Sequence, residues 1–98
     1  MQELKDTHRL QDILNTTENL FLVLGASWCD NCTNLKNKIT QFSQGKITSY
    51  FIDLDKNQDF VDEYEVKKIP VLLGFKNGIL TFTSQGATVD IETIISNF

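Results

Sequence analysis

The sequence predicts an α/β fold in which a small mixed β-sheet is flanked by helices on both faces. Three observations lead to this prediction. Apolar runs of strand length alternate with segments of helical periodicity, Asn77-Gly78 separates the last two strand-like runs, and no repeat or linker interrupts the 98 residues. The alternation implies mostly parallel pairing, and the Asn-Gly turn adds an antiparallel hairpin. We expect about four or five strands in a single domain over residues 1–98.

The first part of the chain is expected to contain a short strand, a helix and a longer strand. Residues 2–5 favour an edge strand, and Thr7 is a candidate N-cap for a helix that runs to about Asn15. After a polar connection, Leu20–Leu24 is an uninterrupted apolar run, which is typical of a strand covered on both faces. The apolar face of the helix consists of Leu10, Ile13 and Leu14.

The middle of the chain repeats this pattern. Helical spacing follows the cysteine motif, and Gly45 is placed to end that helix as a C′ residue. Residues 47–54 are expected to form the next strand, and a short helix is expected to start at Asp55. The apolar faces of the two helices consist of Cys32, Leu35, Ile39 and Phe42, and of Phe60, Val61 and Tyr64.

The last part of the chain predicts a hairpin and a final helix. Val71–Phe75 and Ile79–Thr83 are expected to be strands joined by a turn at Lys76–Gly78, because Asn-Gly readily adopts positive φ angles. The second strand alternates apolar and polar residues, as a half-buried strand does. The final helix is expected to begin near Thr88. Its first turn carries Asp90 and Glu92, and its buried face consists of Ile91, Ile94, Ile95 and Phe98.

Composition argues against several classes of function. Thirteen acidic and nine basic residues give a net charge of −4 without a basic cluster, so nucleic acid is not an expected partner. No stretch is long enough to span a membrane, and the start of the chain lacks the character of a secretory signal. If the chain is complete, we expect it to be cytoplasmic. In that compartment a close cysteine pair is more often catalytic or metal-binding than a structural disulfide.

The only two cysteines lie three positions apart, in Trp28-Cys29-Asp30-Asn31-Cys32, between an apolar run and an amphipathic helix. Free N–H groups and the helix dipole at a helix N-terminus stabilise a thiolate, which is the attacking species in disulfide exchange. We therefore predict that Cys29 attacks and that Cys32, one turn further on, resolves the mixed disulfide. Asp30, with Asn31 beside it, is expected to modulate the ionisation of Cys29, because its carboxylate disfavours a second negative charge there.

The chain resembles the thioredoxin family over essentially its whole length. The matching segments are the strand leading into Ala26-Ser27-Trp28-Cys29-x-x-Cys32, then Lys68-Ile69-Pro70-Val71, Phe75-Lys76-Asn77-Gly78 and Gly86. The resemblance implies a thioredoxin-like fold and thiol–disulfide exchange, with a cis Pro70 against the cysteine pair. It also implies a substrate-binding rim, where the Ile69 backbone pairs with an extended substrate segment and a partner packs against Trp28.

Several positions depart from the usual pattern of that family. Asp30-Asn31 replaces Gly-Pro between the cysteines, and Gly25 takes the place of an aromatic residue. Val23 stands where the family has a buried aspartate, and Phe51 stands where it has the lysine paired with that aspartate. The aspartate is thought to exchange a proton with the second cysteine, so we expect disulfide exchange to persist with slower deprotonation of Cys32.

Other readings of the same residues stay open. Zinc needs four ligands, and apart from the two cysteines only the distant His8 is available, so metal binding would require a dimer or carboxylates. His8 is expected to be a solvated residue rather than a catalytic base. Asp53 or Asp55 is an alternative candidate for a substitute proton acceptor. Lys67 and Lys68 are either exposed loop lysines or charges near the rim.

The function we predict is thiol–disulfide exchange that reduces protein disulfides. The cysteine pair needs no bound cofactor or metal, but it needs an external electron donor, which by family resemblance is a flavin-dependent disulfide reductase such as thioredoxin reductase. We expect a monomer with protein disulfides as substrates. The alternative is a redox-weak accessory module that docks partners through the rim formed by Trp28 and Pro70.

Overall fold

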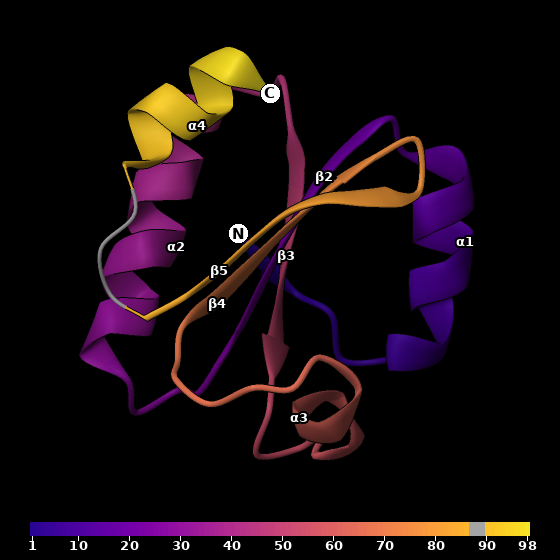
Figure 1. Ribbon diagram of the computed structural model, residues 1–98, viewed down its shortest axis with the longest axis vertical. Coiled ribbons are helices and arrows are strands. Elements are labelled where there is room, and N and C mark those ends of the chain that lie inside the picture. Colours follow the sequence, from indigo (N-terminus) through magenta and orange to yellow (C-terminus); the bar gives the residue numbers. More distant parts are fainter. Residues whose placement is uncertain (87–89) are drawn as a thin grey trace.

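The computed structural model describes residues 1–86 and 90–98, and in it a five-stranded sheet lies between two pairs of helices (Figure 1). The strands are β1 (Gln2–Glu3), β2 (Asn19–Gly25), β3 (Thr48–Asp53), β4 (Val71–Lys76) and β5 (Ile79–Gln85). The helices are the 3₁₀ turn η1 (Thr7–Arg9), α1 (Leu10–Thr16), α2 (Asp30–Ser43), α3 (Asp59–Glu63) and α4 (Ile91–Asn97). The predicted α/β fold is confirmed.

The strands follow the order β1-β3-β2-β4-β5 across the sheet. β1 and β2 both pair with β3 in parallel, as the strand–helix–strand alternation predicted. β4 instead pairs with β2 in the antiparallel sense, and β5 pairs antiparallel with β4. The helix α3 and the turns around it lie at the end of the sheet where β3 finishes (Figure 1). The chain therefore re-enters the sheet at the end where β3 left it.

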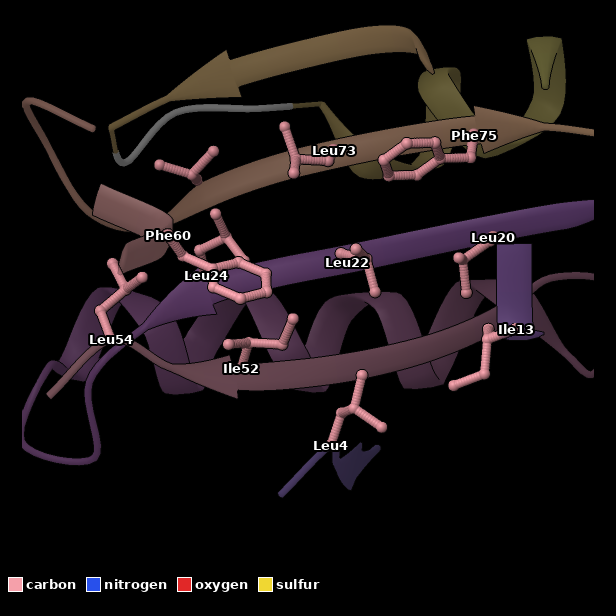
Figure 2. Packing of buried hydrophobic residues seen from close by; sticks show 11 residues of the cluster. Leu4, Ile13, Leu20, Leu22, Leu24, Ile52, Leu54, Phe60, Leu73 and Phe75 are labelled. Atoms are coloured by element: carbon pink, nitrogen blue, oxygen red, sulfur yellow. The ribbon is translucent and has the colours of Figure 1, made fainter. Parts of the chain in front are cut away.

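Two layers of apolar side chains cover the sheet, one on each face. The layer under α1 and α3, seen in Figure 2, consists mainly of Leu20, Leu22, Leu24, Ile52, Leu73 and Phe75 of the sheet with Ile13 and Phe60 of the helices. The layer under α2 and α4 consists mainly of Phe21, Val23, Phe51, Leu72, Leu35, Ile39 and Ile91. Residues Leu20–Leu24 of β2 alternate between the two layers and are all fully buried, so the prediction of a strand covered on both faces is confirmed.

Two predicted helix starts are corrected. The first helical segment is capped by Asp6 and not by Thr7, because the Asp6 carboxylate accepts a hydrogen bond from the N–H of His8 (3.1 Å). Asp90 is the N-cap of α4 and not a first-turn residue, since its carboxylate accepts from the Thr93 N–H (3.2 Å). Thr88, where this helix was expected to begin, lies outside the described residues.

The short helix predicted from Asp55 begins only at Asp59. The intervening residues form turns, in which Lys56 N–H donates to the Asp53 carbonyl and the Asn57 side chain donates to the same carbonyl (2.9 Å). At the other end of the chain, both turn residues of the predicted hairpin have positive φ, 52° at Asn77 and 80° at Gly78, which confirms that turn.

The half-buried pattern expected of the last strand is only partly followed. β5 lies at the edge of the sheet, and a register irregularity occurs between Gly74 and Phe75 on the strand beside it. Ile79 and Leu80 are 68% and 45% exposed, whereas Phe82 packs against the α2/α4 layer. Gly45 follows α2 with a φ of 79°, as its predicted C′ role requires. Within the described residues, no helix combines the length and apolarity needed to cross a bilayer.

Candidate active site

The main residues predicted from the sequence to form the site lie at one end of the sheet. β2 ends here at Gly25, which pairs with Asp53 at the end of β3. β4 starts at the same end, where Val71 pairs with both Leu24 of β2 and Gln85 of β5. The cysteine loop, the turn after β3 and the Ile69–Pro70 segment therefore leave or enter the sheet side by side.

Cys29 is the N-cap of α2. The loop after β2 closes through a hydrogen bond from the Cys29 N–H to the Ala26 carbonyl (3.2 Å), which turns the chain into the helix. The Cys29 Sγ accepts a hydrogen bond from the N–H of Cys32 (3.1 Å) and is partly exposed. Unpaired N–H groups and the helix dipole both favour an anion at this position. The location predicted for Cys29 is the observed one.

Cys32 lies in the first turn of α2 and is completely buried. A Cβ atom added to Gly25 would lie 2.5 Å from the Cys32 Sγ and 3.4 Å from Cε1 of Phe51. Gly25 is thus the residue that leaves room for the second thiol. This explains why a side chain, aromatic or otherwise, is absent at this position of the chain.

The environment of Cys32 opposes its ionisation. Burial, and then the hydrogen bond with Cys29, raise the pKa of the Cys32 thiol from 9.0 to about 12, while the Ala26 backbone and the charge of Lys36 act in the opposite direction. Both cysteines are free thiols in this structure. The Cys29 sulfur is therefore accessible at the end of the helix, whereas the Cys32 sulfur is buried and is kept as a thiol.

Apolar side chains occupy positions 23 and 51, where the sequence lacks the buried aspartate and the lysine paired with it. Val23 is fully buried and Phe51 is nearly so, both in the layer under α2. The Nζ of Lys36, one turn after Cys32 on the helix, lies 3.9 Å from the centroid of the Phe51 ring. A cation–π contact thus keeps a positive charge on the Cys32 side of α2.

The residues of the expected rim lie around this end of the sheet. The Ile69–Pro70 peptide bond is cis, and the Pro70 carbonyl accepts from the Gly86 N–H (2.9 Å). Ile69 is half-buried against the α1/α3 layer. Trp28 is 70% exposed, and its indole N–H donates to Asp55 Oδ2 (2.9 Å). The apolar face of Trp28 is therefore available to a partner while its polar edge is fixed.

The Trp28–Asp55 contact was not foreseen from the sequence, where Asp55 was considered only as a proton acceptor. Its signal was topological: Asp55 follows a strand that runs parallel to β2, so both chain segments emerge at the same end of the sheet. Asp53 is only 4% exposed, and its Oδ1 accepts from the Asp55 N–H (2.9 Å), so it holds this turn in place.

The remaining candidate residues are solvent-exposed. Asp30 and Asn31 open α2 next to Cys29, and Lys67 and Lys68 precede the Ile69–Pro70 bond. His8 lies in η1 and is exposed as expected. Across residues 1–86 and 90–98, no three His, Cys, Asp or Glu side chains come together in a way that could hold a metal ion.

Comparisons with known proteins agree with this arrangement. The family model described as Thioredoxin matches residues 1–97. The chain is 31% identical over 80 residues to thioredoxin from Pseudomonas aeruginosa, covering 79% of this chain and 74% of that one. It is also 31% identical over 93 residues to thioredoxin from Buchnera aphidicola, covering 92% and 85%.

Solved structures show the same fold. Oxidised mitochondrial thioredoxin 3 from Saccharomyces cerevisiae superposes with a TM-score of 0.85 at 22% identity, over 100% of this chain and 95% of that one. Plasmodium falciparum thioredoxin superposes with a TM-score of 0.86 at 18% identity, over 100% and 99%.

Proposed function

The chain belongs to the thioredoxin family and is a thiol–disulfide oxidoreductase, and on that premise we propose that it reduces protein disulfides through Cys29 and Cys32. The observation that carries the proposal is the unequal setting of two thiols one helical turn apart. Cys29 is partly exposed at the N-terminus of α2, whereas Cys32 is buried behind it. An accessible thiol suits attack on a substrate, and a buried one suits an intramolecular reaction.

The reaction has two exchange steps. The Cys29 thiolate attacks one sulfur of the substrate disulfide, so that a mixed disulfide forms and the other substrate sulfur leaves as a thiolate. Cys32 then loses its proton and attacks the Cys29 Sγ, which forms the Cys29–Cys32 disulfide and releases the second substrate sulfur. Two electrons pass to the substrate, whose thiolates take up protons from solvent. An external dithiol returns the electrons to the cysteine pair.

Docking of the substrate is assigned to the rim beside the cysteines. The exposed face of Trp28 offers apolar contact area, and its bond to Asp55 limits the freedom of the indole before binding. Ile69 and Pro70 directly precede β4, which pairs with the strand that leads to the cysteine loop, and this supports a role in holding an extended substrate segment. Asp30 and Asn31 flank the attacking sulfur and are assigned to tuning its ionisation.

The electron donor is proposed from the family, and the rest of the wider cycle is proposed from the sequence. The electron donor is a flavin-dependent disulfide reductase, and net electron flow runs toward protein disulfides in the cytoplasm. The chain acts as a monomer whose redox group is the cysteine pair alone, with no cofactor or metal taking part. Residues 1–98 work as a single domain.

Turnover of a protein disulfide tests this proposal. With dithiothreitol as donor, the wild-type chain is expected to accelerate the reduction of insulin disulfides, and neither Cys29→Ser nor Cys32→Ser is expected to sustain turnover. Asn34→Ala, an exposed change on the same helix, is the matched control and should keep full activity. A wild-type chain that binds insulin without accelerating its reduction would instead favour the docking module.

A further inference from the structure

The segment between α3 and Pro70 has no helix or strand of its own. It leaves α3 through Glu65, a non-glycine residue with a φ of 51°. The Val66 N–H donates to the Val61 carbonyl (2.9 Å), which ends the helical turn. Lys67 and Lys68 then lead directly into the Ile69–Pro70 bond. The course of these few residues determines where the Ile69 backbone lies.

One side chain from a distant strand holds this segment. Gln85 is the last residue of β5, and its Oε1 accepts hydrogen bonds from the N–H groups of Lys67 (2.9 Å) and Lys68 (3.2 Å). Its Nε2 donates to the Glu65 carbonyl (3.1 Å). The amide of Gln85 thus serves three backbone groups within four residues. No other hydrogen-bond partner for the Lys67 and Lys68 N–H groups is found in the part of the chain that the structure describes.

The chemistry of these contacts is specific to a glutamine. An acceptor for two N–H groups and a donor for a carbonyl are needed on one side chain of this length, and only a primary amide offers both. The neighbouring Gly86 N–H donates to the Pro70 carbonyl, so β5 is tied to the segment on both sides of Ile69. All polar atoms of the Gln85 side chain are used on this segment and none on the cysteines.

We propose that Gln85 is a positioning residue for substrate docking: its amide holds residues 65–68 so that the Ile69 backbone is already in place for a protein disulfide. This inference rests on the proposed function, because it presumes that substrate binds along Ile69. Without the clamp, binding must also order the segment, which weakens docking. The thiol chemistry is unaffected, since Gln85 does not contact either sulfur.

Steady-state kinetics with two substrates test the clamp. Gln85→Ala is expected to raise KM for insulin by about three- to tenfold, the effect of losing roughly one net hydrogen bond, with kcat changed by less than about twofold. The rate with bis-hydroxyethyl disulfide, which is too small to use the rim, should stay within about twofold of wild type. Gln85→Glu keeps the acceptor but loses the donor, so an intermediate KM is expected. Thr83→Ala, exposed on the same face of β5, is the matched control and should match wild type.

Amide hydrogen exchange gives a second test of the Gln85 clamp that does not depend on turnover. The Lys67 and Lys68 amides should lose protection in Gln85→Ala and retain it in Gln85→Glu and Thr83→Ala. An unchanged insulin KM, or a parallel loss of rate with both substrates, would overturn the positioning role. If the wild type itself does not reduce insulin, the proposed function fails, and unchanged amide protection in Gln85→Ala would then still overturn the clamp.

Discussion

In the proposed reaction, the speed of the second exchange step depends on Cys32. Burial raises its pKa, and so does its hydrogen bond with Cys29. When the Cys29 sulfur is bonded to a substrate it carries no charge, so the electrostatic influence of Cys29 on Cys32 ends while burial remains. Formation of the mixed disulfide therefore prepares Cys32 for deprotonation. With Val23 in the buried position behind the motif, the proton must leave without help from a carboxylate there.

The rate of the resolving step should consequently rise with pH. Only the Cys32 thiolate attacks, and burial still raises the pKa of this thiol in the mixed disulfide, so the thiolate fraction grows about tenfold per pH unit through the neutral range. Release of the second substrate thiol in a single turnover, measured at several pH values, reports this step. A plateau near neutral pH would reveal a proton acceptor beside Cys32 and would contradict this prediction.

Gly25 is predicted to be required for closing the disulfide. In Gly25→Ala the new methyl group would lie 2.5 Å from the Cys32 Sγ, so the thiol must move, at a cost of about 1–3 kcal/mol in unfolding free energy. Urea titration should detect the loss, and oxidation by oxidised dithiothreitol should slow. Gly45→Ala is the control: no atom lies within 4 Å of its added Cβ, so it should cost only the left-handed backbone, about 1 kcal/mol, and leave oxidation unchanged.

At the scale of elements, the N-terminus of α2 organises the site. The Cys32 N–H donates to the Cys29 sulfur, and Asp30 lies at the same end of the helix. Two negative charges at this helix end repel each other and share the stabilisation that the helix N-terminus provides. In the proposed function the helix end favours the attacking anion, and Asp30 is assigned to moderating it.

Asp30→Asn should therefore make Cys29 more reactive. An end charge is worth about 0.3–1 kcal/mol, which corresponds to roughly a two- to fivefold faster alkylation by iodoacetamide at neutral pH. Mass spectrometry of the modified Cys29 gives the rate, and high salt should shrink the difference. Asp59→Asn, which removes a carboxylate from the first turn of α3 instead, is the control. An unchanged or slower rate in Asp30→Asn would contradict this role.

Helices, strands and turns were predictable where a short stretch of sequence carries a clear apolar pattern or backbone preference. The Leu20–Leu24 strand and the helix after Cys29 follow directly from apolar periodicity, and the Asn77-Gly78 turn follows from backbone preference. Helix caps were less predictable, because Asp6 and Thr7 are both acceptable caps until backbone geometry selects one. The direction of β4 depended on the end of the sheet at which α3 and its turns lie, which a short apolar pattern does not define.

The sequence predicted the cysteines and the proline of the site, but it did not predict the side chains that hold the surrounding segments in place. The cysteines and Pro70 stand out because few residue types perform their roles. Asp55 and Gln85 act through contacts with segments distant in sequence, 27 residues away for Trp28 and 17–20 residues away for the Gln85 partners. Nothing in the local pattern around a polar residue on a strand end indicates such a partner.

At the scale of the molecule, β2 joins both apolar layers and carries the cysteine loop. Leu22 is fully buried at its centre, so Leu22→Ala should lower the free energy of unfolding by about 2–5 kcal/mol. Ile79 is 68% exposed on the edge strand, and Ile79→Ala should change it by less than about 0.5 kcal/mol. Urea unfolding of both reduced variants checks the contrast. Equal losses would contradict the burial of Leu22 at the centre of β2.

The proposed function depends on different roles for the two sulfurs: Cys29 attacks the substrate, and Cys32 resolves the mixed disulfide. Incubation of each single-cysteine variant with insulin, followed by mass spectrometry under non-reducing conditions, measures this directly. We predict that Cys32→Ser accumulates a covalent adduct joined through Cys29, while Cys29→Ser forms none because its remaining thiol is buried. An adduct of equal yield in Cys29→Ser, or none in Cys32→Ser, would contradict the proposed roles.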